Sequence, residues 1–122
     1  MIYTGIDIIE IDRIIRVKDL YQARFLKKIY TLNEIKYCRN RGPQLASRFA
    51  AKEAMMKTLG TGIRGIPWKS IEVVRMRGQA PQILLHGPAK AKAKELKIKY
   101  IALSLSHSKN LAVASVVAET KN

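Results

Sequence analysis

The pattern of apolar and polar positions predicts a strand followed by a long helix at the start of the chain. Residues 2–9, IYTGIDII, are apolar and rich in β-branched side chains, as expected for a buried strand. Residues 12–29 predict one helix, with Asp12 as its candidate N-cap. The core-facing arc of this helix is expected to contain Ile14, Ile15, Tyr21, Phe25 and Ile29.

Two further helices are predicted before the middle of the chain. Thr31 and Glu34 form a T-x-x-E capping box, which predicts a short helix over residues 31–39. A third helix is predicted over residues 44–59. Gly60 is expected to end it, because glycine readily adopts the left-handed conformation found after helices.

After the loop that follows residue 60, the apolar period changes to two. Residues 70–77 and 81–87 predict strands of a hairpin around the turn RGQA. A short helix is predicted over residues 88–97. Residues 99–107 and 111–119 then predict two strands joined by the tripeptide SKN.

The expected order is β-α-α-α-β-β-α-β-β, an α+β fold with a mostly antiparallel sheet packed against helices. At 48% hydrophobic residues, we expect one domain over residues 1–122. No apolar run approaches the roughly 18 residues of a membrane span. The first residues also lack the pattern of a signal peptide, so we expect a cytoplasmic protein without a membrane segment.

The charge of the chain is strongly one-sided. It has 23 Lys and Arg against nine Asp and Glu, a formal net charge of +14. Its partners should therefore be anionic, but net charge does not distinguish nucleic acid from a phosphorylated small molecule or an acidic protein.

Glu53 stands among apolar neighbours on the third predicted helix. One arc of that helix contains Ala46, Phe49, Ala50, Glu53, Ala54 and Lys57. Burying an ionised carboxylate costs several kcal/mol unless a cation or hydrogen bonds compensate it. An ion pair between Glu53 and Lys57 on an exposed face is the alternative, although it contributes only roughly a few tenths of a kcal/mol.

Asp7 is a second misplaced carboxylate, because it stands between isoleucines in the first strand, where aspartate is rare. It could simply accept backbone N–H bonds at the strand end. If the strand packs on the third helix, however, Asp7 and Glu53 could converge. Two hard oxygen ligands, completed by waters and phosphate oxygens, are typical of a Mg²⁺ site.

Other polar residues near the third helix carry weaker signals. Arg48 and Lys52 lie on the far side of the helix from Glu53. On charge alone, a solvated face and a functional role are equally good interpretations of these two residues. The tripeptide Gly60-Thr61-Gly62 allows close approach of a ligand to the backbone. A plain helix stop is favoured there, because a helix C-terminus is the wrong end of the dipole for an anion.

His107 and Cys38 provide no independent catalytic signal. His107 follows a strand, with no Asp nearby to suggest a Ser-His-Asp hydrolase. Cys38 is the only cysteine, so it cannot form an internal disulfide and is expected to be structural.

A stripe of basic and apolar residues runs along the first predicted helix. Its members are Arg13, Val17, Leu20, Arg24, Lys27 and Lys28. No aromatic residues alternate with these charges, so the stripe resembles a docking surface for an acidic amphipathic helix more than a nucleic-acid interface. A solvated charged face remains an equal alternative.

Three segments resemble one family when taken together: GIDIIEIDRI at 5–14, SRFAAKEAMMKTLGTGI at 47–63 and SLSHSKNLAVASVV at 104–117. Their order and distances are similar to those of the holo-[acyl-carrier-protein] synthases, the bacterial 4′-phosphopantetheinyl transferases of about this length. The resemblance extends over the whole chain.

The resemblance implies transfer of the 4′-phosphopantetheine moiety of coenzyme A to a serine of apo-acyl carrier protein. Adenosine 3′,5′-bisphosphate is released, and the product supports fatty acid biosynthesis. It also implies a homotrimer with active sites between subunits. The acidic carrier protein explains the basic charge better than nucleic acid does.

By the same resemblance, Asp7 and Glu53 are the Mg²⁺ ligands and Lys57 contacts the coenzyme A diphosphate. The implied nucleotide contacts, besides Lys57, are Arg48, Gly60, Thr61, Gly62, Pro81 and His107. The carrier protein is implied to dock along Arg13, Val17, Leu20, Arg24 and Lys28.

The chain departs from the family pattern at a few positions. Ser47 stands where the family usually has Gly, and Leu111 replaces an aromatic residue that often follows the S-x-SH turn. The connection CRNRGPQ before the third helix is short, which leaves open whether Arg39 and Arg41 reach a coenzyme A phosphate.

Overall fold

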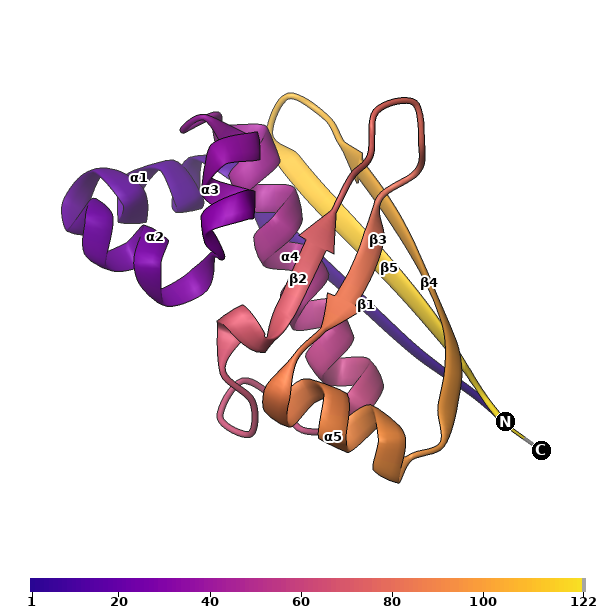
Figure 1. The fold of residues 1–122 in the computed structure, drawn as a ribbon. Coiled ribbons are helices and arrows are strands. Elements are labelled where there is room, and N and C mark those ends of the chain that lie inside the picture. The colour runs from indigo at the N-terminus through magenta and orange to yellow at the C-terminus, as the bar shows by residue number, and fades with distance from the viewer. Residues whose placement is uncertain (122) are drawn as a thin grey trace.

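The computed structural model describes residues 1–121, and Figure 1 shows the arrangement of their helices and strands. The elements are β1 (Ile2–Glu10), α1 (Ile11–Tyr21), α2 (Ala23–Ile29), α3 (Leu32–Cys38), α4 (Gly42–Leu59), the 3₁₀ turn η1 (Trp68–Ser70), β2 (Ile71–Val74), β3 (Gln82–Leu85), α5 (Gly87–Glu95), β4 (Ile98–His107) and β5 (Leu111–Thr120).

The strands form two antiparallel groups. Within residues 1–121, the larger sheet has the order β1-β5-β4, and β2 pairs only with β3 in a separate hairpin. In the larger sheet Asp7 lies opposite Ala114, and Ser104 lies opposite Ser115. These pairings confirm the predicted α+β class with antiparallel strands.

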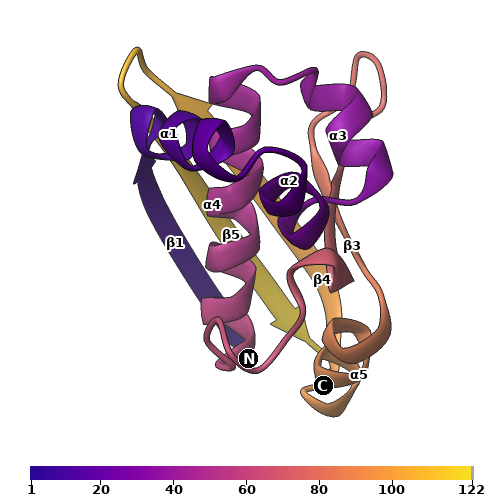
Figure 2. The same cartoon turned by 90° about the vertical axis from the view of Figure 1, so that its left-hand side faces the viewer.

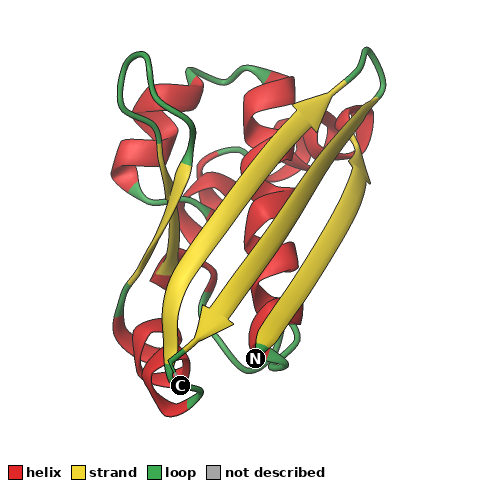
Figure 3. Ribbon diagram, turned by 90° about the vertical axis from the view of Figure 1, so that its right-hand side faces the viewer, coloured by secondary structure: helices red, strands yellow, loops and turns green. Residues whose placement is uncertain are grey.

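Helix α4 runs along one face of the larger sheet (Figure 2). Gly5 permits this close contact, because a Cβ at that position would overlap the carbonyl oxygen of Ala54 and the hydroxyl of Thr58. The close approach of β1 brings Asp7, two residues further along the same strand face, beside α4. Within residues 1–121 no helix covers the opposite face of the sheet (Figure 3).

The predicted first helix is broken in two, which is the main error in the expected element order. Gln22 adopts φ 46° between α1 and α2. The break turns α2 toward the core, so that Phe25 packs edge-on against Tyr30 with ring centroids 5.8 Å apart. Tyr21, predicted to be in the core, is instead 54% exposed. Tyr21 is the last residue of α1, and the break after it ends the apolar arc that was predicted to continue along one helix.

The start of α1 also differs from the prediction. Glu10 is the N-cap residue and makes no side-chain cap, while Asp12 lies in the first turn. The amide of Ile11 donates to the carbonyl of Asn110 at 2.9 Å. The turn between β4 and β5 therefore supplies the acceptor for the first amide of α1, and Asp12 is not the N-cap residue.

Other local predictions agree with the structure. The Thr31 and Glu34 capping box is present in full at the start of α3. Gly60 ends α4 in the left-handed region, with φ 74°. The hairpin strand β2 is shorter than predicted and ends at Val74. Residues 75–80 after it are exposed and include a turn from Met76 to Gln79.

Helix α4 is enclosed on nearly every side, by the sheet and by α1, α3 and β2. Arg48 and Lys52 are 5% and 0% exposed, so the predicted solvated face for them was wrong. Lys52 forms an ion pair with the fully buried Glu34, with Nζ 2.8 Å from Oε1. Lys52 also donates to the carbonyls of Trp68 and Ile71.

None of the helices described is both long and apolar enough to cross a membrane.

Candidate active site

Asp7 and Lys57 meet where β1 lies against α4. The Nζ atom of Lys57 is 3.2 Å from Asp7 Oδ1 and donates to the carbonyl oxygen of Ile6 at 2.9 Å. The Asp7 side chain is largely buried, whereas Lys57 is exposed. The predicted alternative, an ion pair between Glu53 and Lys57, does not occur among residues 1–121, because Lys57 reaches across to Asp7 instead.

Glu53 is half-buried beside this pair. Burial raises the pKa of the Glu53 carboxyl above its ordinary value, and the Asp7 carboxylate raises it further; Lys57 and Arg13 oppose this. The two carboxylates therefore repel each other unless they share a proton or a cation. The structure thus brings Asp7 and Glu53 together.

The donor atoms of this pair suit a hard divalent cation. Both are carboxylate oxygens, which Mg²⁺ prefers, and Mg²⁺ usually takes one or two carboxylates and completes its shell with waters and phosphates. Among the residues described, no cluster of three or more Asp, Glu, His or Cys side chains could hold a metal. A metal bound here would thus take no more than two Asp, Glu, His or Cys side chains from the described part of the chain.

A cavity of about 470 Å³ opens beside the carboxylate pair. Its lining includes Glu53, Met56, Lys57, Thr61, Gly62, Ile63 and Arg64. Two residues of the tripeptide Gly60-Thr61-Gly62 are therefore adjacent to the carboxylates. Gly60 itself is the helix cap and does not line the cavity. Arg64 was not identified from the sequence, because it carries no motif signal and is placed only by the course of the loop.

The other predicted nucleotide contacts gather in a second, smaller cavity of about 210 Å³. It is lined by Tyr37, Gln44, Ser47, Arg48, Arg75, Pro81, Leu105 and His107. Arg48, Pro81 and His107 therefore come together from α4, the β2–β3 loop and the end of β4. Tyr37 and Arg75 were missed, because tertiary packing alone brings Tyr37 on α3 and Arg75 in the β2–β3 loop to this cavity.

The two cavities have no lining residue in common. The predicted site residues on the described chain thus form two separate groups, one around Asp7 and Glu53 and one around Arg48 and His107. Arg41 joins neither group. It donates to the carbonyls of Tyr37 and Cys38 at 2.7 and 2.9 Å, at the end of α3.

Cys38 has the structural character expected from the sequence. It is fully buried, and burial raises the pKa of its thiol to about 11. The thiol therefore stays protonated near neutral pH and is a poor nucleophile.

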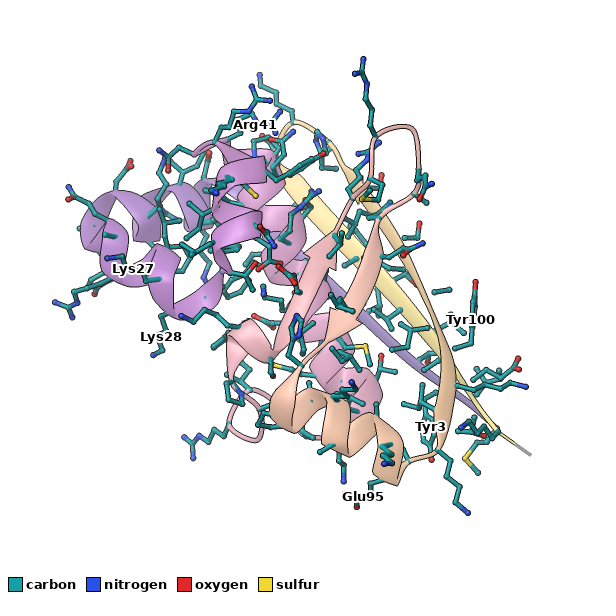
Figure 4. The ribbon with its side chains drawn as sticks, viewed as in Figure 1. Tyr3, Lys27, Lys28, Arg41, Glu95 and Tyr100 are labelled. Carbon is teal, nitrogen blue, oxygen red and sulfur yellow. The ribbon has the colours of Figure 1, made fainter. Side chains whose placement is uncertain are left out.

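The break at Gln22 divides the predicted docking stripe between two helices. Arg13, Val17 and Leu20 lie on α1, and Arg24 and Lys28 lie on α2. Val17 is half-buried, and the other four are exposed. Figure 4 shows Lys27 and Lys28 on the side of the molecule formed by α1 and α2, away from the sheet.

Arg24 and Lys28 also line an aromatic cavity of about 480 Å³. The other lining residues are Tyr21, Phe25, Ile29, Phe49, Ile63 and Trp68. Phe49 stacks on Trp68 with ring centroids 4.7 Å apart. An apolar side chain flanked by acidic residues would be complementary to this surface.

The uncovered face of the larger sheet carries several exposed apolar side chains. Its exposed residues include Ile2, Ile6, Ile8, Tyr100 and Val117. Exposed apolar patches of this kind usually mark interaction surfaces.

Comparison with known proteins assigns this chain and its fold to a family. The model of the 4′-phosphopantetheinyl transferase superfamily matches residues 3–116. A holo-[acyl-carrier-protein] synthase of Solibacter usitatus is 46% identical over 120 residues, covering 95% of this chain and 96% of that protein.

Solved structures agree. The holo-[acyl-carrier-protein] synthase of Helicobacter pylori, in complex with coenzyme A, has a TM-score of 0.86 and 32% identity, covering 95% of this chain and 99% of that one. The Bacillus anthracis enzyme, in complex with CoA (3′,5′-ADP), has a TM-score of 0.79 and 34% identity, covering 98% and 96%. The chain therefore belongs to the 4′-phosphopantetheinyl transferase superfamily, in its holo-[acyl-carrier-protein] synthase family, and is a transferase.

Proposed function

We propose that the protein transfers the 4′-phosphopantetheine moiety of coenzyme A to a serine hydroxyl of apo-acyl carrier protein and releases adenosine 3′,5′-bisphosphate. The observation that carries the proposal is the pair of Asp7 and Glu53, with Lys57, beside an open cavity. The names of the relatives and their complexes with coenzyme A support it.

Asp7 and Glu53 would hold Mg²⁺, which fits their repelling carboxylates and their hard oxygen donors. When bound, the ion would neutralise charge on the diphosphate of coenzyme A. Lys57 lines the same cavity, and its ammonium group, which pairs with Asp7, would bind a diphosphate oxygen. Arg64 is placed to add a second positive charge there.

In the reaction, the serine oxygen forms a bond to the phosphorus on the pantetheine side of the diphosphate. The bond from that phosphorus to the bridging oxygen breaks, and adenosine 3′,5′-bisphosphate leaves with the electron pair. The serine proton is lost to a base. No nucleophile from the enzyme is required, so the chain contributes positioning and charge neutralisation.

The second group of residues, Arg48, Pro81 and His107, would bind the nucleotide end of coenzyme A. Because this group and Glu53 line separate cavities of one chain, we propose that a complete site combines one group from each of two subunits. The exposed apolar face of the sheet is the candidate subunit interface, and the expected assembly is a homotrimer.

The carrier protein is acidic in this proposal and docks on Arg13, Val17, Leu20, Arg24 and Lys28. A role in fatty acid biosynthesis and a cytoplasmic location complete the proposal, and both rest on family resemblance.

The test is a carrier-mass assay. The protein is mixed with coenzyme A, Mg²⁺ and several apo-carrier proteins, and the mass of each carrier is measured. We expect a gain of one phosphopantetheine on at least one carrier. Glu53→Gln should slow the transfer by at least about 100-fold, because it removes a charge that binds the metal. Glu95→Gln, at an exposed site on α5, is the matched control. Unchanged mass on every carrier would refute the proposal.

A further inference from the structure

Arg48 is a buried cation that faces a cavity. Arg48 is only 5% exposed, and it lines the 210 Å³ cavity. Within residues 1–121, no carboxylate lies within ion-pair distance of its guanidinium. A buried charge without a counter-charge costs several kcal/mol, so this cavity favours an anionic ligand.

The rest of the cavity has the same electrostatic character. Arg75 and His107 add basic groups, and no Asp or Glu is among the lining residues. Arg48 can offer a planar set of N–H donors to a phosphate, which is the group such a fork recognises best. Coenzyme A carries a phosphate of this kind on the 3′ position of its ribose.

Two neighbours fix the direction of the Arg48 side chain. The guanidinium carbon lies 4.4 Å from the ring centroid of Tyr37, in a cation–π contact. Arg48 Nη1 donates to the hydroxyl oxygen of Ser47 at 3.1 Å. Arg41 in turn donates to the carbonyl of Tyr37, which holds that residue in place.

The hydroxyl of Ser47 is itself oriented. It donates to the carbonyl of Gln44 one turn earlier in α4, at 3.1 Å, so its lone pairs remain for Arg48. Ser47 is 3% exposed, so water does not readily replace this bond. An alanine or glycine at this position would offer no such acceptor.

We propose that Ser47 is a positioning residue, which with Tyr37 holds the Arg48 guanidinium in the orientation that binds the 3′-phosphate of coenzyme A. The inference rests on the proposed function, since coenzyme A is the source of the phosphate. It assigns to Ser47 a part in the preference for 3′-phosphorylated nucleotides over nucleotides that lack this group.

The experiment measures binding of adenosine 3′,5′-bisphosphate and of 5′-AMP by titration calorimetry at one ionic strength. Wild-type protein should prefer the bisphosphate. Ser47→Ala should reduce that preference about fivefold, because a hydrogen bond to a charged group is lost, while affinity for 5′-AMP is kept. Ser47→Thr retains the hydroxyl and should restore the preference. Arg48→Ala removes the guanidinium itself and should abolish the preference, so it gives the reference for complete loss.

Thermal unfolding of each variant shows whether it is folded. An unchanged preference in Ser47→Ala, or an equal loss of affinity for both nucleotides, would overturn the inference. If wild-type protein transfers phosphopantetheine but does not distinguish the two nucleotides, the inference fails and the proposed function stands. If wild-type protein neither binds coenzyme A nor modifies any carrier, the proposed function itself has failed.

Discussion

Burial raises the pKa of the Glu53 carboxyl, and the nearby Asp7 carboxylate raises it further, so a metal bound by this pair would compete with the proton on Glu53. Because the folded protein then holds this proton at a higher pH than the unfolded chain does, its free energy of unfolding should fall as pH rises above about 4.5, the ordinary pKa of the group. If the ionised pair binds Mg²⁺ as proposed, the ion should restore the lost stability.

Urea unfolding at several pH values, in chelator and in Mg²⁺, tests this expectation. Glu53→Gln should remove the contribution of Glu53 to the pH dependence of the free energy of unfolding, and it should also remove the stabilisation by Mg²⁺. Glu95→Gln should keep both, because that carboxylate is exposed on α5. Identical pH slopes in the wild type and in Glu53→Gln would contradict the assignment.

At the scale of elements, the buried ion pair of Lys52 and Glu34 joins three segments. Glu34 also accepts from the amides of Thr31 and Val73, at 2.9 and 2.8 Å, so one carboxylate connects the start of α3, the middle of α4 and β2. Burial lowers the pKa of Lys52, and Glu34 opposes that effect.

Lys52→Met should destabilise the protein by about 3–5 kcal/mol, because Glu34 would be left buried without its cation. Lys94→Met, an exposed lysine on α5, is the control and should have little effect. Chemical denaturation of both variants gives the comparison. A loss no larger than that of Lys94→Met would show that the pair contributes nothing to stability.

The docking stripe leads to another prediction at the element scale. Arg24→Glu should weaken carrier binding about tenfold and leave coenzyme A affinity nearly intact, because a charge at the rim of an interface acts on the macromolecular partner. Lys90→Glu makes the same change in charge on the exposed surface of α5, so it is the matched control and should leave carrier binding nearly unchanged. Equal loss of both affinities in Arg24→Glu would argue against docking on α2.

Local signals predicted elements well, and tertiary contacts explain the failures. The Thr31 capping box and the Gly60 stop depend on neighbouring residues, so they could be read directly. The break at Gln22 could not, because it serves the packing of Phe25 on distant residues. Lys52 was misplaced because its partner, Glu34, lies on another helix.

The same distinction applies to the candidate site. Asp7 and Glu53 were found because each disturbs an otherwise apolar pattern, whereas Arg64 and Arg75 are basic residues among many in a chain of net charge +14. Only the folded loops place them in the cavities.

At the scale of the whole molecule, the two groups of site residues suggest shared active sites. That residues 1–122 form one domain and assemble as a trimer stays a prediction. Complementation tests the assembly: Glu53→Gln and His107→Ala subunits, each inactive or weak alone, are unfolded, mixed and refolded together.

If sites lie between subunits, the mixture should recover about a quarter of the wild-type sites, because each site has one chance in two of receiving each intact half. Carrier-mass assays measure the recovery, and sedimentation of the wild type gives the number of subunits. Activity no greater than the sum of the two separate variants would place both groups in one chain.

The backbone contact at Gly5 has a consequence for the order in which this protein opens. Since β1 carries Asp7 and lies against α4 without an intervening side chain, detachment of the strand and separation of the carboxylates are a single event. A metal bound by both carboxylates should therefore slow hydrogen exchange of the β1 amides more than that of β2, which supplies no ligand. Hydrogen exchange followed by mass spectrometry, with and without Mg²⁺, tests whether the metal protects β1 more than β2.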